Sequence, residues 1–393
     1  MAEAVIAGAV RTPIGSFMGT LSSVHATDLG AIAVREALSR AGVPAAEVGE
    51  VILGNCLSAG LGQGVARQVA LKAGVPDSVP ATAVNQLCGS GLRAVAVAAQ
   101  QVLLGDAEVV VAGGTESMSG APYLLPKARA GYRMGNGEIL DSMISDGLQC
   151  SIENVHMGVT AENVAAQLEI SRADQDAFAL ESQRRTAEAV RAGRFDAEIV
   201  PVPVAQRRGD PVQVTADEHP RTGTTIEDLA KLRPAFQADG TVTAGNASGI
   251  NDGAAAVVVL SREAADRLGV TPQAIIRGWA TAGVPPRVMG LGPVKAVPLA
   301  LAKAGVELGD IDLIELNEAF AAQSLAVIRE LGMDPGRTNV NGGAIALGHP
   351  VGASGARVLT TLLHEMARRE VRLGLATLCI GGGQGIAMVV ERV

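Results

Sequence analysis

Asn85-Gln86-Leu87-Cys88-Gly89-Ser90-Gly91-Leu92-Arg93 is the stretch from which the fold of this chain can be worked out. After it, Leu92 to Leu104 contains Leu, Val, Ala and Gln but no glycine or proline, which predicts a helix. Its Ser-Gly-x-Arg pattern returns 264 residues later as Ser354-Gly355-Ala356-Arg357, ahead of another helical segment that ends near Arg369. The recurrence indicates an internal repeat.

The repeat extends well beyond this motif. Ala41 to Asn55 parallels Ala304 to Asn317, and Ala107 to Gly114 parallels Gly374 to Gly382. Similar separations across several segments indicate one duplicated unit. Each unit alternates apolar strands with helical stretches, which is typical of a mixed, mainly parallel sheet covered by helices. The sequence therefore predicts an α/β fold of two similar halves around one central crevice.

Cys88 is the first candidate for chemistry. A thiol at the start of a helix lies where backbone N–H groups and the helix dipole favour the nucleophilic thiolate. The flanking Gly89 and Gly91 would permit a tight strand-to-helix turn and leave room for another chain or a ligand near the sulfur. The alternative is a buried structural cysteine, which is common for free thiols.

Three further side chains lie at strand ends or glycine-rich turns. His349 lies in the glycine-dense loop Asn341 to Gly352, Cys379 ends an apolar strand before three glycines, and Asn317 follows a strand-like segment. Each could instead be an ordinary loop or core residue. Such positions are where α/β proteins build their sites, and the repeat relates the Cys88 and His349 segments, so we predict one shared site.

Composition excludes several classes of protein. The 393-residue chain is long enough for two or three cores, and its net charge of −8 argues against nucleic-acid or anionic-membrane binding. The four cysteines form no CxxC pair, and no histidine spacing suits zinc, so neither a metal site nor a disulfide framework is expected. We find no cationic leader and no apolar run of transmembrane length, which predicts a cytoplasmic protein.

The segments around Cys88, Asn317, His349 and Cys379 together resemble the thiolase family, in particular its biosynthetic branch. The resemblance covers essentially the whole chain without large insertions. It implies the thiolase fold, with duplicated βαβαβαββ halves in a five-layered α-β-α-β-α core and an inserted loop domain. Further matching segments are His156 to Asn163, Lys231 to Phe236 and Gly245 to Gly253.

The expected domains follow from the repeat and the resemblance. Residues 1–118, continued by about 245–268, form the N-terminal half of the core, and residues 269–393 form the C-terminal half. The insert, residues 119–244, resembles the loop domain that covers the active site and binds coenzyme A. Its charged run Ser171 to Ala192 opens with Ser171 and Asp174, which predicts a capped helix.

The resemblance implies a role for each candidate catalytic residue. Cys88 would carry the acyl group, His349 would accept its proton, and Cys379 would be the base that removes a proton from carbon. Asn317 would hold a water molecule that, with His349, stabilises an enolate. The N–H groups of Cys88 and Gly381 would form a second oxyanion hole, a feature worth about 10²–10³ in rate per donor.

Six residues are expected to bind substrate. His156 and Ser248 match positions that contact the pantetheine arm. The chain is acidic at Glu227-Asp228-Leu229, where some relatives carry a small hydroxyl residue near the adenine, so Arg221 becomes the candidate for holding the nucleotide. Phe236, Met289 and Phe320 are further candidates for the pocket. His219 lies outside the motifs and is interpreted as a packed or solvated histidine.

The resulting functional prediction is an acetyl-CoA C-acetyltransferase acting in fatty acid metabolism. It would reversibly condense two acetyl-CoA molecules to acetoacetyl-CoA and CoA through an acyl-Cys88 intermediate. Its partners would be these thioesters and its own copies in a homotetramer, a pair of dimers, without cofactor. The main alternative is a degradative 3-ketoacyl-CoA thiolase of broader chain length.

Three other classes fit the residues less well. A ketoacyl synthase would need a histidine or asparagine where Cys379 stands. Gly89 to Ala94 fits the loose GxGxxA pattern of nicotinamide oxidoreductases, but the acidic residue expected about 20 positions later has no clean match. A non-catalytic protein that binds coenzyme A would have little reason to carry all four candidate side chains.

Overall fold

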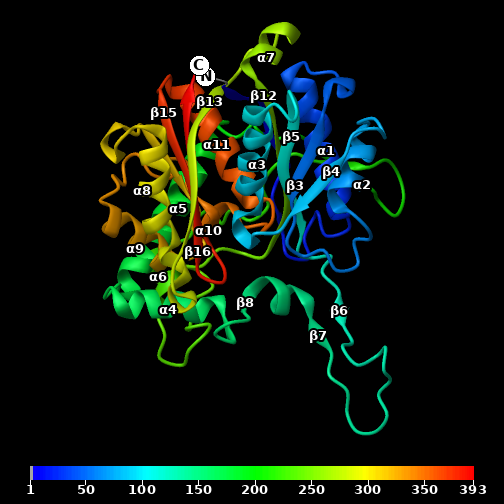
Figure 1. Cartoon of the computed structure of the whole chain (residues 1–393). Coiled ribbons are helices and arrows are strands. Elements are labelled where there is room, and N and C mark those ends of the chain that lie inside the picture. Colours follow the sequence, from blue (N-terminus) through cyan, green and yellow to red (C-terminus); the bar gives the residue numbers. More distant parts are fainter. Residues whose placement is uncertain (1–2) are drawn as a thin grey trace.

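One continuous mixed sheet of ten strands organises the molecule (Figure 1). The computed structural model describes residues 3–393. The strand order is β14-β15-β16-β13-β1-β12-β5-β3-β4, with the short β2 paired to β12. The strands are β1 Ala4–Arg11, β2 Gly15–Ser16, β3 Glu50–Gly54, β4 Ala81–Val84, β5 Val109–Ser117, β12 Asn251–Ser261, β13 Ala274–Gly283, β14 Leu313–Leu316, β15 Leu373–Ile380 and β16 Gln384–Arg392.

The sheet contains the same pattern twice. In the first half, β3 is parallel to β4 and β5, and β12 runs antiparallel to β5 and β1. In the second half, β14 is parallel to β15, and β16 runs antiparallel to β15 and β13. The two halves join where β1 and β13 pair at Val5–Ile275 and Ile6–Ala274. The predicted duplication is therefore present in the topology.

Helices cover both outer faces of the half-sheets and fill the space between them. Helices α1 and α2 pack on the outside of the first half, and α8 and α9 on the outside of the second. Helices α3 and α11 pack against each other and against strands of both halves (Figure 1). The predicted α-β-α-β-α layers are confirmed. The helices are α1 Ala26–Ala41, α2 Val65–Ala73, α3 Ser90–Leu104, α7 Arg262–Leu268, α8 Gly292–Ala304, α9 Ala321–Leu331, α10 Ala344–Leu347 and α11 Ser354–Arg369.

The two central helices approach each other so closely that their backbones touch. A Cβ atom on Gly91 of α3 would lie 2.7 Å from the Ala356 nitrogen, and one on Gly355 of α11 would lie 2.3 Å from the Leu92 nitrogen. Both glycines belong to the repeated Ser-Gly-x-Arg motif. The motif thus marks the contact between the halves and brings the starts of α3 and α11 together.

Burial corrects the sequence alignment of the repeat by one residue. Val51 and Leu53 of β3 face the outer core, and their counterparts in β14 are Ile314 and Leu316, which do the same. The alignment that paired Asn55 with Asn317 is therefore wrong, and Asn55 corresponds to Glu318. Because side chains alternate between the two faces of a strand, an alignment error of one residue exchanges those faces. The amino-acid sequence alone did not reveal this error.

The segment Leu87–Leu104 also departs from expectation. It is long and apolar enough to cross a membrane by length and composition, whereas the sequence analysis found no such run. The physical reason is that α3 lies between two half-sheets, and a helix buried on most sides is apolar around most of its surface.

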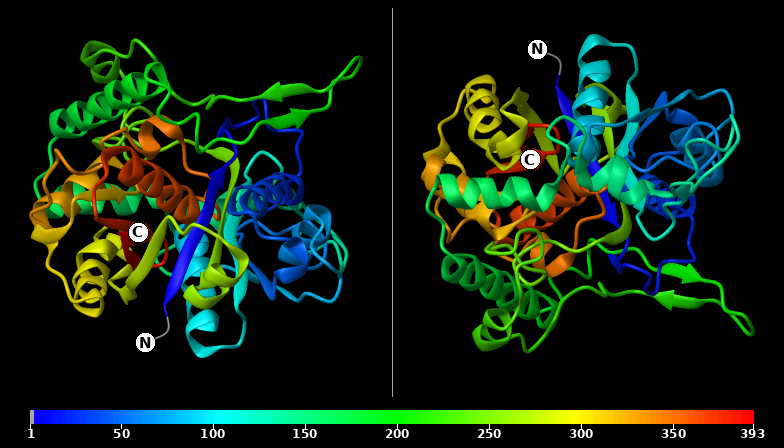
Figure 2. Two further views of the ribbon diagram at one scale, coloured as in Figure 1. Left: turned by 90° about the horizontal axis from the view of Figure 1, so that it is seen from above. Right: turned by 90° about the horizontal axis from the view of Figure 1, so that it is seen from below.

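The insert forms a separate group of short hairpins and of helices of 5 to 20 residues. Its two longer helices, α4 and α5, pack on α9 of the second half, and the cap at Ser171 and Asp174 is present. Hairpin β6–β7 reaches away from the body in Figure 1, and β10–β11 projects in Figure 2. The boundaries at residues 118, 244 and 268 stay a prediction. The elements are β6 Tyr123–Leu124, β7 Leu140–Asp141, β8 Gln149–Cys150, β9 Val155–His156, α4 Met157–Gln167, α5 Arg172–Arg191, β10 Val202–Val204, β11 Val212–Val214 and α6 Ile226–Ala230.

The contact between α3 and α11 generates a test. Gly355→Ala should lower the free energy of unfolding by about 1–3 kcal/mol, because the new methyl group would overlap the α3 backbone, which cannot move aside as a side chain can. Urea or thermal unfolding measures the loss. Gly309→Ala is the matched control, since a Cβ there meets open space. Equal stability of the two variants would contradict the role given to this contact.

Candidate active site

A pocket of about 480 Å³ opens where both halves of the core meet the insert. Its wall comes from the end of β5, from the loops that precede α3 and α11, and from the insert around α4. The predicted residues on its lining are Cys88, His156, Arg221, Phe236, Ser248, Met289, Phe320, His349 and Gly381. Lining residues that the sequence analysis did not name include Phe17, Met118, Ile144, Leu148, Met157, Ile250 and Val351.

Cys88 lies in a tight turn at the start of α3. Leu87 has a φ of 48°, an uncommon conformation for a residue with a side chain. The Ser90 hydroxyl donates to the Leu87 carbonyl at 2.6 Å and accepts the Gln86 N–H at 2.8 Å, and these bonds hold the turn. The residue is half-buried, and its sulfur faces the N–H groups of Cys88 itself and of Gly381.

The glycines beside Cys88 leave room for other chain segments, as predicted, but they do not form the turn. The left-handed residue of the turn is Leu87, whereas Gly89 has a φ of −81°, which any residue adopts. A Cβ on Gly89 would lie 2.4 Å from the Ile380 side chain. Gly89 and Gly91 are therefore small because β15 and α11 pack against the start of α3, and they are not required for the turn itself.

Burial keeps the resting thiol protonated. Transfer of a thiolate out of water is costly, so burial raises the pKa of Cys88 to about 11, although the N–H groups of Gly381 and Cys88 lower it. The sequence analysis considered only the stabilising effect of the helix start. In the folded protein desolvation is larger, and thiolate formation needs a proton acceptor.

His349 is held in one orientation by its neighbours. Its ring Nδ1 lies 2.5 Å from the Ser354 hydroxyl, which donates to the Pro350 carbonyl at 2.8 Å. Its backbone N–H donates to the Asn251 side chain at 2.8 Å. Because the serine hydrogen goes to Pro350, we assign the ring hydrogen to Nδ1, which leaves a lone pair on Nε2.

The His349 ring is neutral. Burial lowers its pKa to about 3, and the positive charge of Arg357 contributes in the same direction. Nε2 has no hydrogen-bond partner among the described residues, and the ring lies on the pocket wall. The side chain can thus hold a proton only transiently. This suits a group that takes the proton of a nearby thiol and passes it on.

Cys379 and Asn317 lie behind the pocket wall and are completely buried. The pKa of Cys379 is raised, first by burial and then by the proximity of Cys88. Neither the Nδ2 nor the Oδ1 atom of Asn317 has a partner within residues 3–393. A buried amide without protein partners is where an ordered water is expected. The structure thus gathers the predicted catalytic residues in one region, with three on the wall and two behind it.

Aromatic rings form the part of the pocket contributed by the insert. His156 stacks on Phe236 with ring centroids 4.7 Å apart, and Phe236 meets Phe320 edge to face at 6.3 Å. His156 also accepts the Gly158 N–H and so caps α4. Partial burial lowers the pKa of His156, which keeps its ring neutral. These rings offer an uncharged, flat surface for an extended ligand.

A second, smaller pocket of about 240 Å³ shares residues with the first. Arg221 and His219 line both, and Asp228 lines only the smaller one. The sequence analysis interpreted His219 as a packed or solvated histidine and did not predict this position on the pocket lining. Because it belongs to no recognisable motif, only the folding of the insert onto the core places it there.

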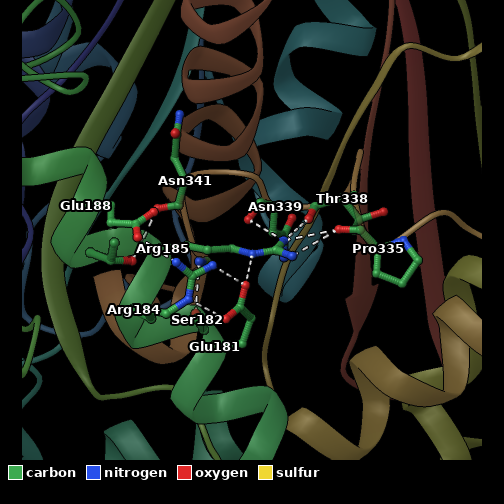
Figure 3. Close-up of polar contacts among 12 residues, drawn as sticks. Glu181, Ser182, Arg184, Arg185, Glu188, Pro335, Thr338, Asn339 and Asn341 are labelled. Atoms are coloured by element: carbon green, nitrogen blue, oxygen red, sulfur yellow. Dashed lines mark hydrogen bonds and ion pairs between the residues drawn. The ribbon is translucent and has the colours of Figure 1, made fainter. Parts of the chain in front are cut away.

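Helix α5 braces the chain segment that leads to the His349 loop (Figure 3). Arg185 donates to the carbonyl groups of Pro335, Thr338 and Asn339 at 3.2, 2.7 and 3.2 Å. One turn earlier, the Ser182 hydroxyl donates to buried Glu318 at 2.7 Å and accepts the Gly343 N–H at 3.1 Å. The insert thereby supports the segments carrying Asn317 and His349, as well as covering the pocket.

No group of His, Cys, Asp and Glu side chains in residues 3–393 has an arrangement suited to a metal ion.

Comparison with known proteins matches nearly the whole chain. The family model for the thiolase N-terminal domain matches residues 4–263, and that for the C-terminal domain matches residues 270–392. The chain is 58% identical to an acetyl-CoA acetyltransferase of Chromobacterium violaceum over 390 residues, 99% of this chain and 100% of the relative. It is 57% identical to the Pseudomonas aeruginosa protein of the same name over 392 residues, with both chains fully covered.

Solved structures agree with these relatives. The crystal structure of the Bacillus anthracis acetyl-CoA acetyltransferase superposes with a TM-score of 0.98 at 47% identity, covering 100% of this chain and 99% of that one. The acetyl-CoA acetyltransferase of Syntrophomonas wolfei also gives 0.98, at 44% identity with both chains fully covered.

The protonated state of Cys88 predicts its reactivity. Below the raised pKa, the thiolate fraction increases about tenfold per pH unit, so alkylation by iodoacetamide should accelerate steadily from pH 7 to pH 10. Mass spectrometry of the Cys88 peptide gives the rate, and a model thiol corrects for the reagent. A plateau at or below pH 8 would show a preformed thiolate–imidazolium pair instead.

Proposed function

The chain belongs to the thiolase family, and from this premise we propose that it is an acetyl-CoA C-acetyltransferase. It reversibly joins two acetyl-CoA molecules into acetoacetyl-CoA and CoA. The observation that carries the proposal is the convergence of Cys88, His349 and Gly381 on one pocket, at the contact between the halves. The names of the full-length relatives favour this activity over a degradative enzyme of broader chain length.

In the first half-reaction, Cys88 takes the acetyl group. His349 Nε2 accepts the thiol proton as the sulfur attacks the thioester carbonyl carbon. The C–S bond to CoA breaks, and the departing CoA sulfur receives the proton from His349. The N–H groups of Cys88 and Gly381 already face the reacting sulfur, which supports their role as donors to the transient oxyanion.

In the second half-reaction, carbon must become a nucleophile. Cys379, as its thiolate, removes a proton from the methyl group of a second acetyl-CoA, and the carbanion attacks the acetyl carbon on Cys88. The C–S bond to Cys88 breaks and acetoacetyl-CoA is formed, while the proton on Cys379 passes to the departing Cys88 sulfur, which restores both residues. The enolate oxygen is stabilised by the His349 ring and by a water held on Asn317. His349 thus accepts a proton in the first half-reaction and donates a hydrogen bond in the second. Ser354 supports both roles, because its hydroxyl can donate to Nδ1 or accept from it and so stabilise either tautomer of the ring.

The two adjoining pockets support the binding of an extended ligand such as the coenzyme. The larger pocket takes the pantetheine arm along His156, Phe236 and Ser248, and the smaller pocket takes the nucleotide beside Arg221. Asp228, which lines the smaller pocket, favours an amino group over a phosphate there. At the other end, Phe320, Met157 and Met289 pack beside Cys379 with little exposure, which supports short acyl chains.

Assembly and location are part of the proposal. We propose a homotetramer built as a pair of dimers in the cytoplasm. The β6–β7 hairpin supports this, because its apolar side chains are exposed and a single chain gains nothing by exposing them. Met134 near its tip is 99% exposed, and Tyr123 and Ile139 are also exposed.

The two thiols can be separated experimentally. Cys379→Ser should still take an acetyl group on Cys88 from acetyl-CoA, but should lose most condensation activity, because the hydroxyl is a poorer base toward carbon. Peptide mass spectrometry and a spectrophotometric assay for acetoacetyl-CoA measure the two steps. Cys88→Ala is the control and should lose both. Near wild-type condensation by Cys379→Ser would reject this role, and acetyl label on Cys379 would reverse the assignment.

His156 should act in binding. His156→Ala is expected to raise KM for acetoacetyl-CoA more than it lowers kcat, because it removes a wall of the pantetheine tunnel. His156→Asn is the matched control, since asparagine can still cap α4 and only the ring is lost. The two variants should share the same kinetic change. A large loss of kcat with unchanged KM would place His156 in the chemical step.

A further inference from the structure

Glu116, at the end of β5, has a completely buried carboxylate that the reaction does not use. It does not line the pocket, so it does not touch substrate. Both of its oxygens are nevertheless fully engaged. Oε2 accepts the N–H groups of Gly352 at 2.8 Å and Cys56 at 3.0 Å, and Oε1 accepts the Leu57 N–H at 3.1 Å and the Asn55 amide at 3.0 Å.

These donors come from both halves of the molecule. Asn55, Cys56 and Leu57 form the loop after β3, in the same half as Cys88. Gly352 belongs to the other half and follows His349 by three residues. The carboxylate is therefore a direct link between the half that carries the nucleophile and the loop that carries the histidine.

The space around Gly352 shows how closely the link is fitted. A Cβ on Gly352 would lie 2.7 Å from Glu116 Oε2 and 2.8 Å from the Asn55 Cα. The Gly352 carbonyl is equally confined, because a Cβ on Gly54 or Gly114 would lie 2.7 or 2.2 Å from it. The end of the His349 loop is thus fixed between two strands of the opposite half.

The duplicated fold provides an internal comparison. The separation of 264 residues that relates Ser90 to Ser354 also relates Glu116 to Ile380. Ile380 is the apolar side chain that packs on Gly89, beside Cys88. A hydrocarbon side chain is therefore sufficient to fill the space at this position of the fold. Beside the His349 loop the chain instead buries a carboxylate. This burial is costly unless hydrogen bonds compensate for it, so we infer that the bonds themselves have a purpose here.

We propose that Glu116 is a positioning residue, which sets the distance of His349 from Cys88 through the Gly352 N–H. The inference rests on the proposed function in one respect, namely that His349 exchanges a proton with Cys88. Asn251, which accepts the backbone N–H of His349, fixes the start of this loop. Glu116 fixes its end. The imidazole between the two ends then has little freedom to move.

Glu116→Gln tests the proposal with almost no change in shape. The amide has one oxygen and one NH₂ group. The NH₂ group would face N–H donors whose hydrogen bonds the carboxylate accepts in the wild-type protein. We expect kcat for thiolysis of acetoacetyl-CoA to fall about tenfold to a hundredfold, because a small displacement of a reacting group has effects of this size. KM should change less than about threefold, since the residues lining the pocket are intact.

The matched control is Thr115→Val on the same strand. Thr115 is also fully buried, and its hydroxyl donates to the Ala26 carbonyl on the opposite face of β5. This variant loses a buried hydrogen bond without touching Gly352, so it should lose stability and retain wild-type kcat. If Thr115→Val loses kcat as Glu116→Gln does, the effect is one of general stability and the proposal is overturned.

A double-mutant cycle identifies the partner through which Glu116 acts. Gly352→Ala breaks the same contact from the other side, so the double variant should be no slower than the worse single variant. Multiplying effects would show that Glu116 acts elsewhere and would overturn the inference. If Glu116→Gln does not fold, Gly352→Ala alone decides: a folded variant with wild-type kcat rejects the proposal. Failure of the wild-type protein to acetylate Cys88 would reject the proposed function instead.

Discussion

The contact between the starts of α3 and α11 is the constraint on which the rest of the molecule depends. Gly91 and Gly355 let the two helix backbones touch across the boundary between the halves. Cys88 lies three residues before Gly91, and His349 lies six residues before Gly355. Any side chain larger than hydrogen would separate the helices and, with them, the nucleophile from its base. The site is therefore built by close packing between the duplicated units.

Low polarity around the site determines its resting state. Burial raises the pKa of Cys88 and lowers that of His349, so the thiol and the imidazole are both neutral before substrate binds. Charge appears only when a thioester reaches the sulfur, where the N–H groups of Cys88 and Gly381 already point. Buried Glu116 and Glu318 hold the surrounding loops by hydrogen bonds, so these carboxyl groups support the site from outside the pocket.

The insert has two structural roles that its composition does not indicate. Through His156 and Phe236 it provides the uncharged walls of the pocket. Through Arg185 and Ser182 it holds the carbonyl groups and loops that precede His349 (Figure 3). Removal of the insert would thus loosen the catalytic loop as well as open the pocket.

The sequence by itself determined the duplicated α/β fold, the capped helix at Ser171 and the segments that carry Cys88, Asn317, His349 and Cys379. These follow from local patterns, namely periodicity, glycine-rich turns and a repeated motif, which the chain displays without folding. The family resemblance predicted the identities of the pocket residues, since it compares whole segments.

Only the tertiary structure decided the register of the repeat, the purpose of Gly89 and the protonation of Cys88. It also decided the position of His219 in the pocket and the contacts of Glu116. Each depends on which face of a strand is turned inward, or on how much water neighbouring segments exclude. Those quantities arise between residues that are far apart in the sequence, so no local pattern of residues contains them.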